Sequence, residues 1–184
     1  MDAINVYNPG TKSFRHFGFS HLTDFPEGAQ AGVKSVSSDG SGRIYFGITS
    51  NFGFVASHAM VYFDEKEGSV KRFEYPDSLN LQNVYGSSRD ENGNVWILSY
   101  SGFFRIDSEG RLNKIKDPSR SEFPGYKWFS AINTDPAGMI WLTSNQPMIY
   151  SQDSEKQSDF DIVLIPQFNS RIFPEPQFCP VFQA

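Results

Sequence analysis

The chain has 184 residues, of which 39% are hydrophobic and 20% are charged, a composition typical of a globular protein that buries its own core. The formal net charge is −5 with acidic and basic residues interspersed, so no basic stripe is present to neutralise nucleic-acid phosphates or to attract an anionic membrane. A single cysteine, Cys179, excludes an internal disulfide framework and a cysteine-cluster metal site.

Residues 1–17 come first in the chain and read as two short strands. Ile4–Thr11 followed by Phe14–Phe17 resembles the later pair Val61–Asp64 and Val70–Phe73 in alternation and turn residues. The first twenty residues contain no continuous apolar run, so they predict neither a secretory signal nor a bilayer-spanning segment. We expect residues 1–17 to be the third and fourth strands of a unit that is otherwise four-stranded.

Three longer segments follow, at about residues 33–75, 83–116 and 129–165, and each contains four short alternating strands bounded by Gly, Asn, Asp, Ser and Pro. The predicted strands are Val33–Ser38, Gly42–Ile48, Ala59–Asp64, Val70–Tyr75, Asn83–Ser88, Asn94–Ser99, Phe103–Asp107, Leu112–Ile115, Phe129–Thr134, Met139–Thr143, Met148–Tyr150 and Phe160–Ile165. The remaining residues, 166–184, are rich in proline, which cannot donate into a strand ladder.

Each longer segment carries one copy of the pattern Asp-x-x-Gly-x-(Ile/Val)-(Tyr/Trp)-(Phe/Ile/Leu), beginning at Asp39, Asp90 and Asp135. The spacings of 51 and 45 residues between these aspartates fit repeats that each form one small antiparallel sheet. We therefore predict an all-β fold: a β-propeller of four-stranded blades in a single domain over residues 1–184, with three full blades and a partial one. We expect a section of a larger propeller, or a compact partial one whose exposed edge is covered by the tail or by another copy of the chain. A closed four-bladed ring is the less favoured alternative, because the proline-rich tail would have to supply two inner strands.

The repeated residues predict structural roles. The Asp can accept hydrogen bonds from backbone N–H groups just after it while the Gly adopts a positive φ, which makes a hairpin turn. Tyr45, Trp96 and Trp141 occupy one register in the three repeats, so we expect them to pack between neighbouring blades. Three symmetric carboxylates around a ring could not converge on one catalytic or metal site.

The second repeat carries a family resemblance. Asp90–Ile97 followed by Gly102–Asp107 resembles the repeat of the two-component-regulator propellers, the periplasmic sensing domains of hybrid sensor kinases. Streptogramin-lyase-like propellers have a similar Gly-Asn-(Ile/Val)-Trp phrase, as in Gly93–Trp96. The first resemblance implies an extracytoplasmic sensor, periplasmic or extracellular, with a carbohydrate or other small molecule as its ligand.

Candidate ligand-binding residues lie where the repeats differ. From the aromatic to the residue that ends the third strand there are 19 residues in the first repeat, 11 in the second and 10 in the third, so the first repeat has a longer loop between its second and third strands. Such loops gather with the connections between blades near the mouth of a propeller channel. The candidates in these loops are Asn51, Phe52, Phe54, His58, Tyr100, Asn145 and Gln146.

A second irregular segment, from Asp117 to Trp128, contributes Tyr126 and Trp128 as rings that could stack on a sugar. In each of these loops the aromatic residues could equally pack against the protein itself.

No residue pattern specifies a reaction. The chain lacks a nucleophile elbow, a phosphate loop, a dinucleotide fingerprint and a histidine pair with metal-ligand spacing, so we expect no cofactor and no metal. The preferred hypothesis is a ligand-sensing propeller, and an enzymatic function is less favoured. The alternatives are a lyase or hydrolase acting on a saccharide, with His58 and Tyr100 in one mouth, and a protein-interaction scaffold. A second copy of the chain or further blades are candidate partners.

Overall fold

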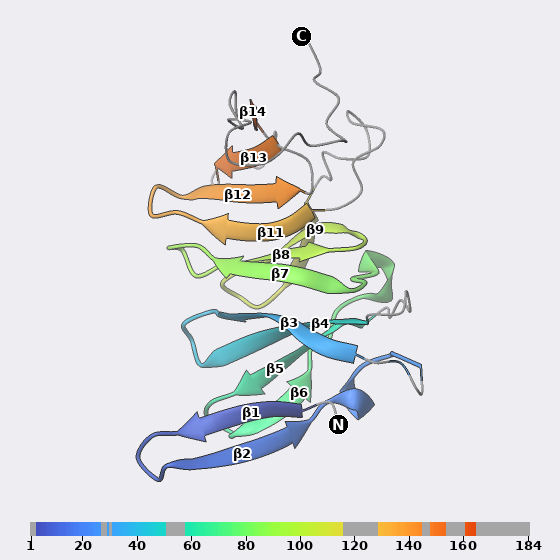
Figure 1. Cartoon of the computed structure of the whole chain (residues 1–184), viewed down its shortest axis with the longest axis vertical. Helices are drawn as coiled ribbons and strands as arrows, with labels where there is room; N and C mark the ends of the chain where they lie inside the picture. Colours follow the sequence, from blue (N-terminus) through green and yellow to red (C-terminus); the bar gives the residue numbers. More distant parts are fainter. Residues whose placement is uncertain are drawn as a thin grey trace, which may run out of the picture.

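The computed structural model describes residues 3–26, 29, 31–50, 58–115, 129–144, 148–153 and 161–164. In these residues the fold is an open section of a β-propeller: one two-stranded and three four-stranded antiparallel sheets stacked in chain order (Figure 1). The strands are β1 (Ala3–Asn8), β2 (Ser13–Gly18), β3 (Ala31–Ser38), β4 (Arg43–Ser50), β5 (Met60–Asp64), β6 (Ser69–Arg72), β7 (Val84–Arg89), β8 (Val95–Ser99), β9 (Gly102–Ile106), β10 (Leu112–Ile115), β11 (Phe129–Thr134), β12 (Met139–Ser144), β13 (Met148–Asp153) and β14 (Asp161–Leu164).

Within each complete sheet the strands lie in chain order, β3-β4-β5-β6, β7-β8-β9-β10 and β11-β12-β13-β14. The first strands of neighbouring complete sheets contact one another: β7 packs against β3 on one side and against β11 on the other. Two short 3-10 helices, η1 (Ser20–Leu22) and η2 (Asp77–Leu79), lie in the connections between sheets. No helix in the described part of the chain has the length and apolar character that a bilayer crossing requires.

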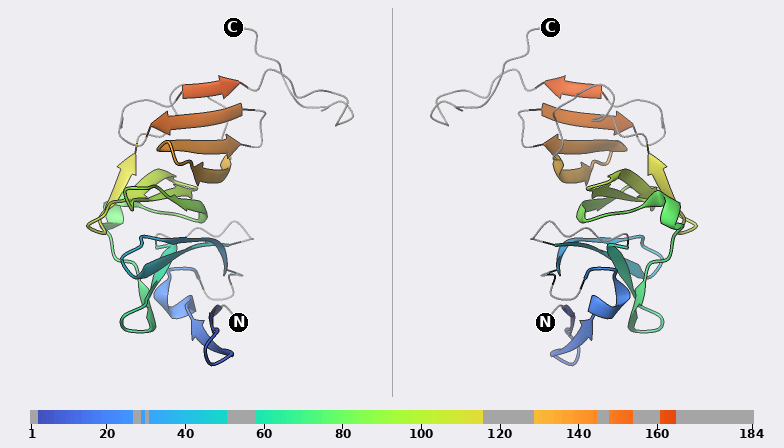
Figure 2. Two further views of the ribbon diagram at one scale, coloured as in Figure 1. Left: turned by 90° about the vertical axis from the view of Figure 1, so that its left-hand side faces the viewer. Right: turned by 90° about the vertical axis from the view of Figure 1, so that its right-hand side faces the viewer.

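The hairpin β1–β2 and the sheet β11–β14 lie at opposite ends of the stack in all views (Figures 1 and 2). The described residues therefore form an open arc and not a closed four-bladed ring.

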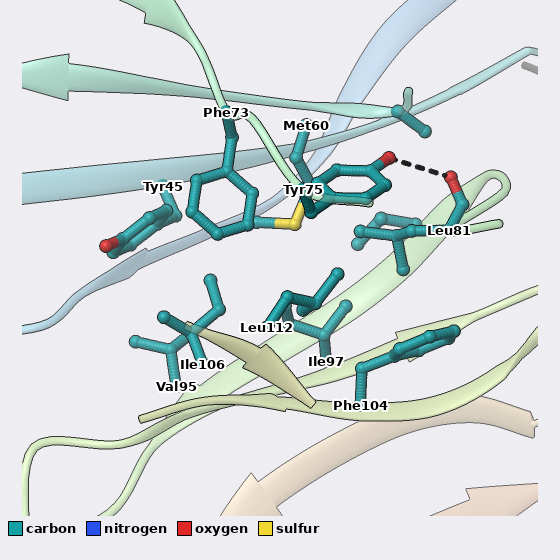
Figure 3. Packing of buried hydrophobic residues seen from close by; sticks show 12 residues of the cluster. Tyr45, Met60, Phe73, Tyr75, Leu81, Val95, Ile97, Phe104, Ile106 and Leu112 are labelled. Carbon is teal, nitrogen blue, oxygen red and sulfur yellow. Dashed lines mark hydrogen bonds between the residues drawn. The ribbon is translucent and has the colours of Figure 1, made fainter. Parts of the chain in front are cut away.

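The core is divided into layers, one between each pair of neighbouring sheets. The largest layer lies between the β3–β6 sheet and the β7–β10 sheet. It includes Tyr45, Met60 and Phe73 on one side and Val95 and Ile97 on the other (Figure 3). Side chains alternate between layers along each strand, as the period of a strand requires. This explains why β4 and β8 are buried along almost their whole length.

The structure confirms the packing role of the repeated aromatic residue in the first two repeats, while Trp141 is only partly buried and belongs to none of the described core layers. Tyr45 and Trp96 are both 0% exposed and each lies in the layer shared with the following sheet. Trp96 stacks on Phe103, with ring centroids 5.3 Å apart. A buried ring of this size removes roughly 150–250 Å² from water, so the first and second repeats each contribute one large apolar anchor to the layer that follows.

The repeated Asp and Gly residues form the predicted turns. In the second repeat Asp90 Oδ1 accepts a hydrogen bond from the N–H of Asn94 at 2.9 Å, and Gly93 has φ 83°. In the third repeat Asp135 Oδ1 accepts from Met139 at 3.0 Å, and Gly138 has φ 78°. These contacts close the turn between the first two strands of each sheet.

The other carboxylate oxygen of each motif makes a contact that the sequence analysis did not foresee. The indole N–H of Trp96 donates to Asp90 Oδ2 at 2.8 Å, and Trp141 donates to Asp135 Oδ2 at the same distance. In the first repeat the hydroxyl of Tyr45 donates to Asp39 Oδ2 at 3.3 Å. The motif therefore joins its turn to the buried aromatic six positions later.

The strands agree closely with the repeat pattern, with two larger differences. The third strand of the third repeat was expected to end at Tyr150, but β13 runs to Asp153. The fourth strand of the first repeat was expected to run to Tyr75, but β6 ends at Arg72. Beyond β6, Phe73 still donates its N–H to the carbonyl oxygen of Met60 at 3.3 Å, and the side chains of Phe73 and Tyr75 lie in the layer between sheets, where both residues are at most 9% exposed. Their alternation reflects burial outside the sheet, which periodicity alone cannot separate from a strand.

Candidate functional site

The connections at one end of the strands gather into what we call the loop face: residues 19–26 between β2 and β3, His58 before β5, residues 73–83 between β6 and β7, and residues 100–101 between β8 and β9. His58 forms a parallel bridge with Leu81. Tyr100 donates its N–H to the carbonyl oxygens of Gln82 and Asn83, both at 3.0 Å. The segment 81–83 thus lies between the loops of the first and second complete sheets.

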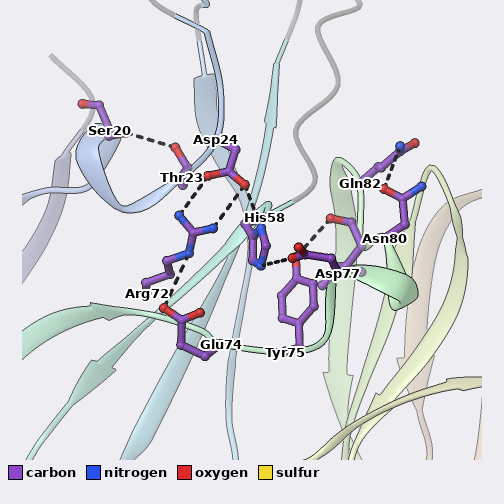
Figure 4. A network of polar contacts seen from close by, with 11 residues as sticks. Ser20, Thr23, Asp24, His58, Arg72, Glu74, Tyr75, Asp77, Asn80 and Gln82 are labelled. Carbon is purple, nitrogen blue, oxygen red and sulfur yellow. Dashed lines mark hydrogen bonds and ion pairs between the residues drawn. The ribbon is translucent and has the colours of Figure 1, made fainter.

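Asp24 is the centre of a charged network on this face (Figure 4). The guanidinium of Arg72 donates two parallel hydrogen bonds to the Asp24 carboxylate, at 2.9 and 3.1 Å. His58 Nδ1 lies 2.7 Å from Asp24 Oδ2. The hydrogen bonds with Asp24 raise the pKa of Arg72 above its ordinary value. A bidentate pair of this geometry fixes the direction of both side chains, so it holds residues 19–26 against the end of β6.

His58 is buried between this network and the next connection. Its Nε2 atom lies 3.6 Å from Asp77 Oδ1, and its ring stacks on Tyr75 with centroids 4.6 Å apart. The Tyr75 hydroxyl donates to the carbonyl oxygen of Leu81 at 3.2 Å, and burial raises the pKa of Tyr75. The imidazole therefore bridges three separate loops: residues 19–26, its own loop and residues 73–83.

The second half of the loop face is built from short polar contacts. Asn83, 4% exposed and with φ 35°, accepts the N–H of Ser50 at 3.3 Å. The Oγ of Ser101 accepts the N–H of Gln82 at 3.1 Å. These bonds position Tyr100, whose side chain is 47% exposed. Burial raises the pKa of the neighbouring Tyr85, and the negative charge of an ionised Tyr100 would raise it further.

Two of the residues predicted from the sequence as ligand contacts lie in the described part of the chain, His58 and Tyr100. Their loops flank the same segment, 81–83, but the two residues differ in exposure: over all atoms of the residue, His58 is 5% exposed and Tyr100 is 47% exposed. The other predicted residues lie outside the described residues; they are Asn51, Phe52, Phe54, Tyr126, Trp128, Asn145 and Gln146. Their role as ligand contacts remains a prediction.

Sequence reasoning missed the partners of His58. Asp24 and Asp77 lie in irregular segments without a copy in the other repeats, and Arg72 ends the outer strand β6. The only local signal was the longer loop before His58. The contacts themselves span 34 residues to Asp24 and 48 residues between Asp24 and Arg72, so no local pattern encodes them.

The loop face combines a rigid base with exposed polar groups. The side chains of Asp77 and Glu74 are 92% and 75% exposed, while His58 below them is 7% exposed. Exposed carboxylates can accept hydrogen bonds from ligand hydroxyl groups, and an exposed tyrosine ring can stack on an apolar ligand face. No group of three or more His, Cys, Asp or Glu side chains suited to hold a metal ion occurs in the described ranges.

Comparison with protein-family models and with curated proteins finds no match for this sequence. Solved structures do match. The extracellular domain of a hybrid two-component system from B. thetaiotaomicron matches with a TM-score of 0.55 and 17% identity over 90% of this chain and 19% of that one. The extracellular domain of a one-component system from the same organism matches with a TM-score of 0.52 and 16% identity, over 78% and 18% of the two chains. The Dos1 propeller matches with a TM-score of 0.55 and 9% identity, over 88% and 42%.

These similarities establish the fold as a β-propeller and agree with the resemblance seen in the second repeat. The chain spans less than one fifth of the length of the two extracellular domains.

Proposed function

We propose that the chain is a section of a ligand-sensing β-propeller and that a small hydroxylated ligand, a carbohydrate or a similar molecule, binds on its loop face. The observation that carries this proposal is the convergence of three connections on His58, with Tyr100 exposed beside them. A rigid base beneath exposed groups is the arrangement that binding sites on loops require, because it reduces the entropy lost on binding.

The chemistry of the described groups supports a neutral, hydroxyl-bearing ligand. Asp77 offers exposed carboxylate oxygens as acceptors, and Tyr100 offers a ring face and a hydroxyl. Asp24 and Arg72 neutralise each other, so this pair adds no net charge to the face, and the exposed carboxylates of Asp77 and Glu74 would disfavour an anionic ligand. The loop residues Phe52, Phe54, Tyr126 and Trp128 would add further ring faces.

The propeller similarity to extracellular domains of signalling systems supports an extracytoplasmic location and a sensory role. On this proposal the ligand would change the ordering of the loop face, and the propeller would transmit that change to a signalling partner in a two-component pathway.

The test is a thermal-shift screen of the protein against neutral oligosaccharides and small polyols. A ligand that binds only the folded state raises the Tm by mass action. We expect a saturable shift from one sugar class that is lost in Tyr100→Ala and reduced in Asp77→Asn. Both side chains are exposed, so neither substitution should lower the Tm of the unliganded protein.

Tyr7→Ala is the matched control. Tyr7 is similarly exposed, at 50%, but it lies next to the β1–β2 turn, at the end of β1 away from the loop face. It should leave the ligand-induced shift unchanged. A shift that survives Tyr100→Ala and Asp77→Asn together would place the ligand elsewhere, and the absence of a shift from every compound would contradict the proposal.

A further inference from the structure

The hairpin β1–β2 is the only described sheet with fewer than four strands. Asn8 makes the same turn as Asp64: its Oδ1 accepts the N–H groups two and three residues later, at 2.9 and 3.2 Å, and Asp64 does so at 3.0 and 3.1 Å. By this register β1 corresponds to β5, a strand that is paired on both edges. In the described residues β1 is paired on one edge, with β2.

β1 also lacks the charges that protect a free edge. Its sequence, Ala3–Asn8, contains no Lys, Arg, Asp, Glu or Pro, whereas the outer edge strands β6 and β10 carry Lys71, Arg72 and Lys114. Exposed edges of natural sheets are usually blunted by charge or proline. The composition of β1 is that of an interior strand.

A pair of large side chains on this hairpin is uncovered although its equivalents are core. Tyr7 and Phe14 face each other across the ladder with ring centroids 4.9 Å apart and are 50% and 59% exposed. The equivalent cross-strand pair in the second complete sheet, Ile106 and Leu112, is 1% and 9% exposed because the preceding sheet covers it.

The first strand of the first complete sheet shows the same deficit. Val36, three residues before Asp39, is 58% exposed. The equivalent residue, three positions before Asp135, is Ile132. Its side chain packs closely on Gly86 of the preceding sheet: a Cβ added to Gly86 would lie 3.0 Å from Ile132 Cγ2. Among the described residues the sheet before Val36 provides no such neighbour, because β1–β2 corresponds only to the outer two strands of a sheet.

We propose that these features, the free edge of β1 with Tyr7, Phe14 and Val36, form a docking site, which we call the amino-terminal face, for a separate β-hairpin. The partner is a two-stranded antiparallel hairpin with alternating apolar residues and an Asp-x-x-Gly turn. Its second strand pairs antiparallel with β1, as β4 pairs with β5, and its first strand lies over Val36. The site extends an interface that already exists, in which Ile4, Phe17 and Phe19 cover Phe46, Val61 and Phe63.

A second copy of this chain does not fit the same place. Two β1 strands paired antiparallel would be related by a twofold axis perpendicular to the sheet, which keeps corresponding faces on one side. Each copy carries its own β3–β6 sheet on that face, packed through Phe17 and Phe63. The two β3–β6 sheets would then compete for the same space, whereas a separate hairpin brings no such sheet.

The experiment uses a labelled synthetic hairpin with the sequence of residues 83–99, which holds β7, its turn and β8. Fluorescence anisotropy measures binding to the whole chain, and hydrogen exchange measures protection of residues 3–8. We expect saturable one-to-one binding and slower exchange in β1. Tyr7→Lys and Val36→Lys should each weaken binding by about tenfold or more, because a charge is placed against an apolar partner.

Tyr100→Lys is the control, since Tyr100 is 47% exposed and lies on the loop face; it should bind the hairpin as the unchanged protein does. Circular dichroism of each variant verifies that the fold is intact. Three results would overturn the proposal. They are no saturable binding up to about 1 mM hairpin, an affinity in both lysine variants equal to that of the unchanged protein, or a dimer of the chain alone that these two substitutions dissociate.

Discussion

At the scale of single residues, the repeated motif works by joining a turn to a buried ring. Asp90 is 3% exposed and uses both carboxylate oxygens, one for the N–H of Asn94 and one for the indole of Trp96. A buried carboxylate that lost one of these donors would be left partly unsatisfied. The motif is therefore a hydrogen-bonding unit as well as an apolar anchor.

Replacing Trp96 by Phe should test this unit, because it keeps a large ring and removes the indole N–H. We expect the free energy of unfolding to fall by about 1–3 kcal/mol, because Asp90 Oδ2 loses one of its two donors, keeping only the side-chain N–H of Asn94, and because the ring is smaller. Urea denaturation measures it. Tyr45→Phe is the comparison: its hydrogen bond to Asp39 is longer, 3.3 Å, so the loss should be smaller. Equal losses would contradict this ordering of the two hydrogen bonds.

The same contact makes the third turn sensitive to acid. The hydrogen bonds from Trp141 and then from the backbone of Met139 lower the pKa of Asp135 below its usual value. A group with a lowered folded-state pKa stabilises the protein above its unfolded pKa of about 4, and that contribution disappears as pH falls through the folded value. We expect Asp135→Asn to be less stable than the parent at pH 7 and to approach it below about pH 3. Urea titrations at both values measure the difference, and a constant gap would contradict it.

The sequence predicted the roles of the motif residues well because turn formation and periodic burial are local properties. Gly93 and Gly138 have the positive φ that their turns require. The bond between Trp96 and Asp90 was not predicted, since it depends on how the ring packs against the next sheet. The partners of His58 were out of reach for a stronger reason: Asp24 and Asp77 come from two different connections of the fold.

At the scale of elements, Arg72 holds the connection between β2 and β3 in place through Asp24. Arg72→Met keeps most of the aliphatic stem and removes both hydrogen bonds. We expect a loss of about 1 kcal/mol, since the pair is partly exposed, and faster hydrogen exchange in residues 19–26. Arg111→Met is the matched control: Arg111 is 67% exposed and pairs only within its own turn. Equal changes in exchange for both variants would contradict the anchoring role of Arg72.

Close packing between neighbouring sheets depends on Gly47. A Cβ at this position in β4 would lie 2.2 Å from Val84 Cγ1 and 2.4 Å from Ser35 Oγ. Gly47→Ala should therefore destabilise the protein by about 1–3 kcal/mol by forcing the sheets apart. Gly32→Ala in the paired strand β3 meets no atom within 4 Å and should change stability little. Thermal unfolding compares the two variants, and equal Tm values would show that β4 can shift to accommodate the methyl group.

The strands themselves were predictable because the same sequence pattern occurs three times in the chain. The end of β6 was not, because Phe73 and Tyr75 continue the alternation of buried residues beyond Arg72, where the strand ends. Periodicity reports which side chains are buried. It does not distinguish burial against the sheet's own face from burial in the layer beyond its edge.

At the scale of the whole molecule, each sheet packs only on its sequence neighbours, and three separate core layers result. The repeat predicted this stacking. It could not predict whether the stack closes, because closure depends on contacts between the two end sheets and not on any one repeat. The described sheets form an open arc (Figure 2), so stability should be distributed along the stack and not shared by a single core.

Leu142→Ala tests that distribution. Leu142 is 0% exposed in the layer between the second and third complete sheets, so its truncation should cost about 2–4 kcal/mol locally. If stability is a sum over neighbouring sheets, hydrogen exchange should accelerate in β11–β12 and the adjoining β8, while β3–β6 keeps its protection. Met60→Ala, in the layer between the first and second complete sheets, should give the reverse pattern. Uniform acceleration across all sheets in either variant would instead mean that the arc unfolds as one cooperative unit, because loss of one layer would then destabilise every other.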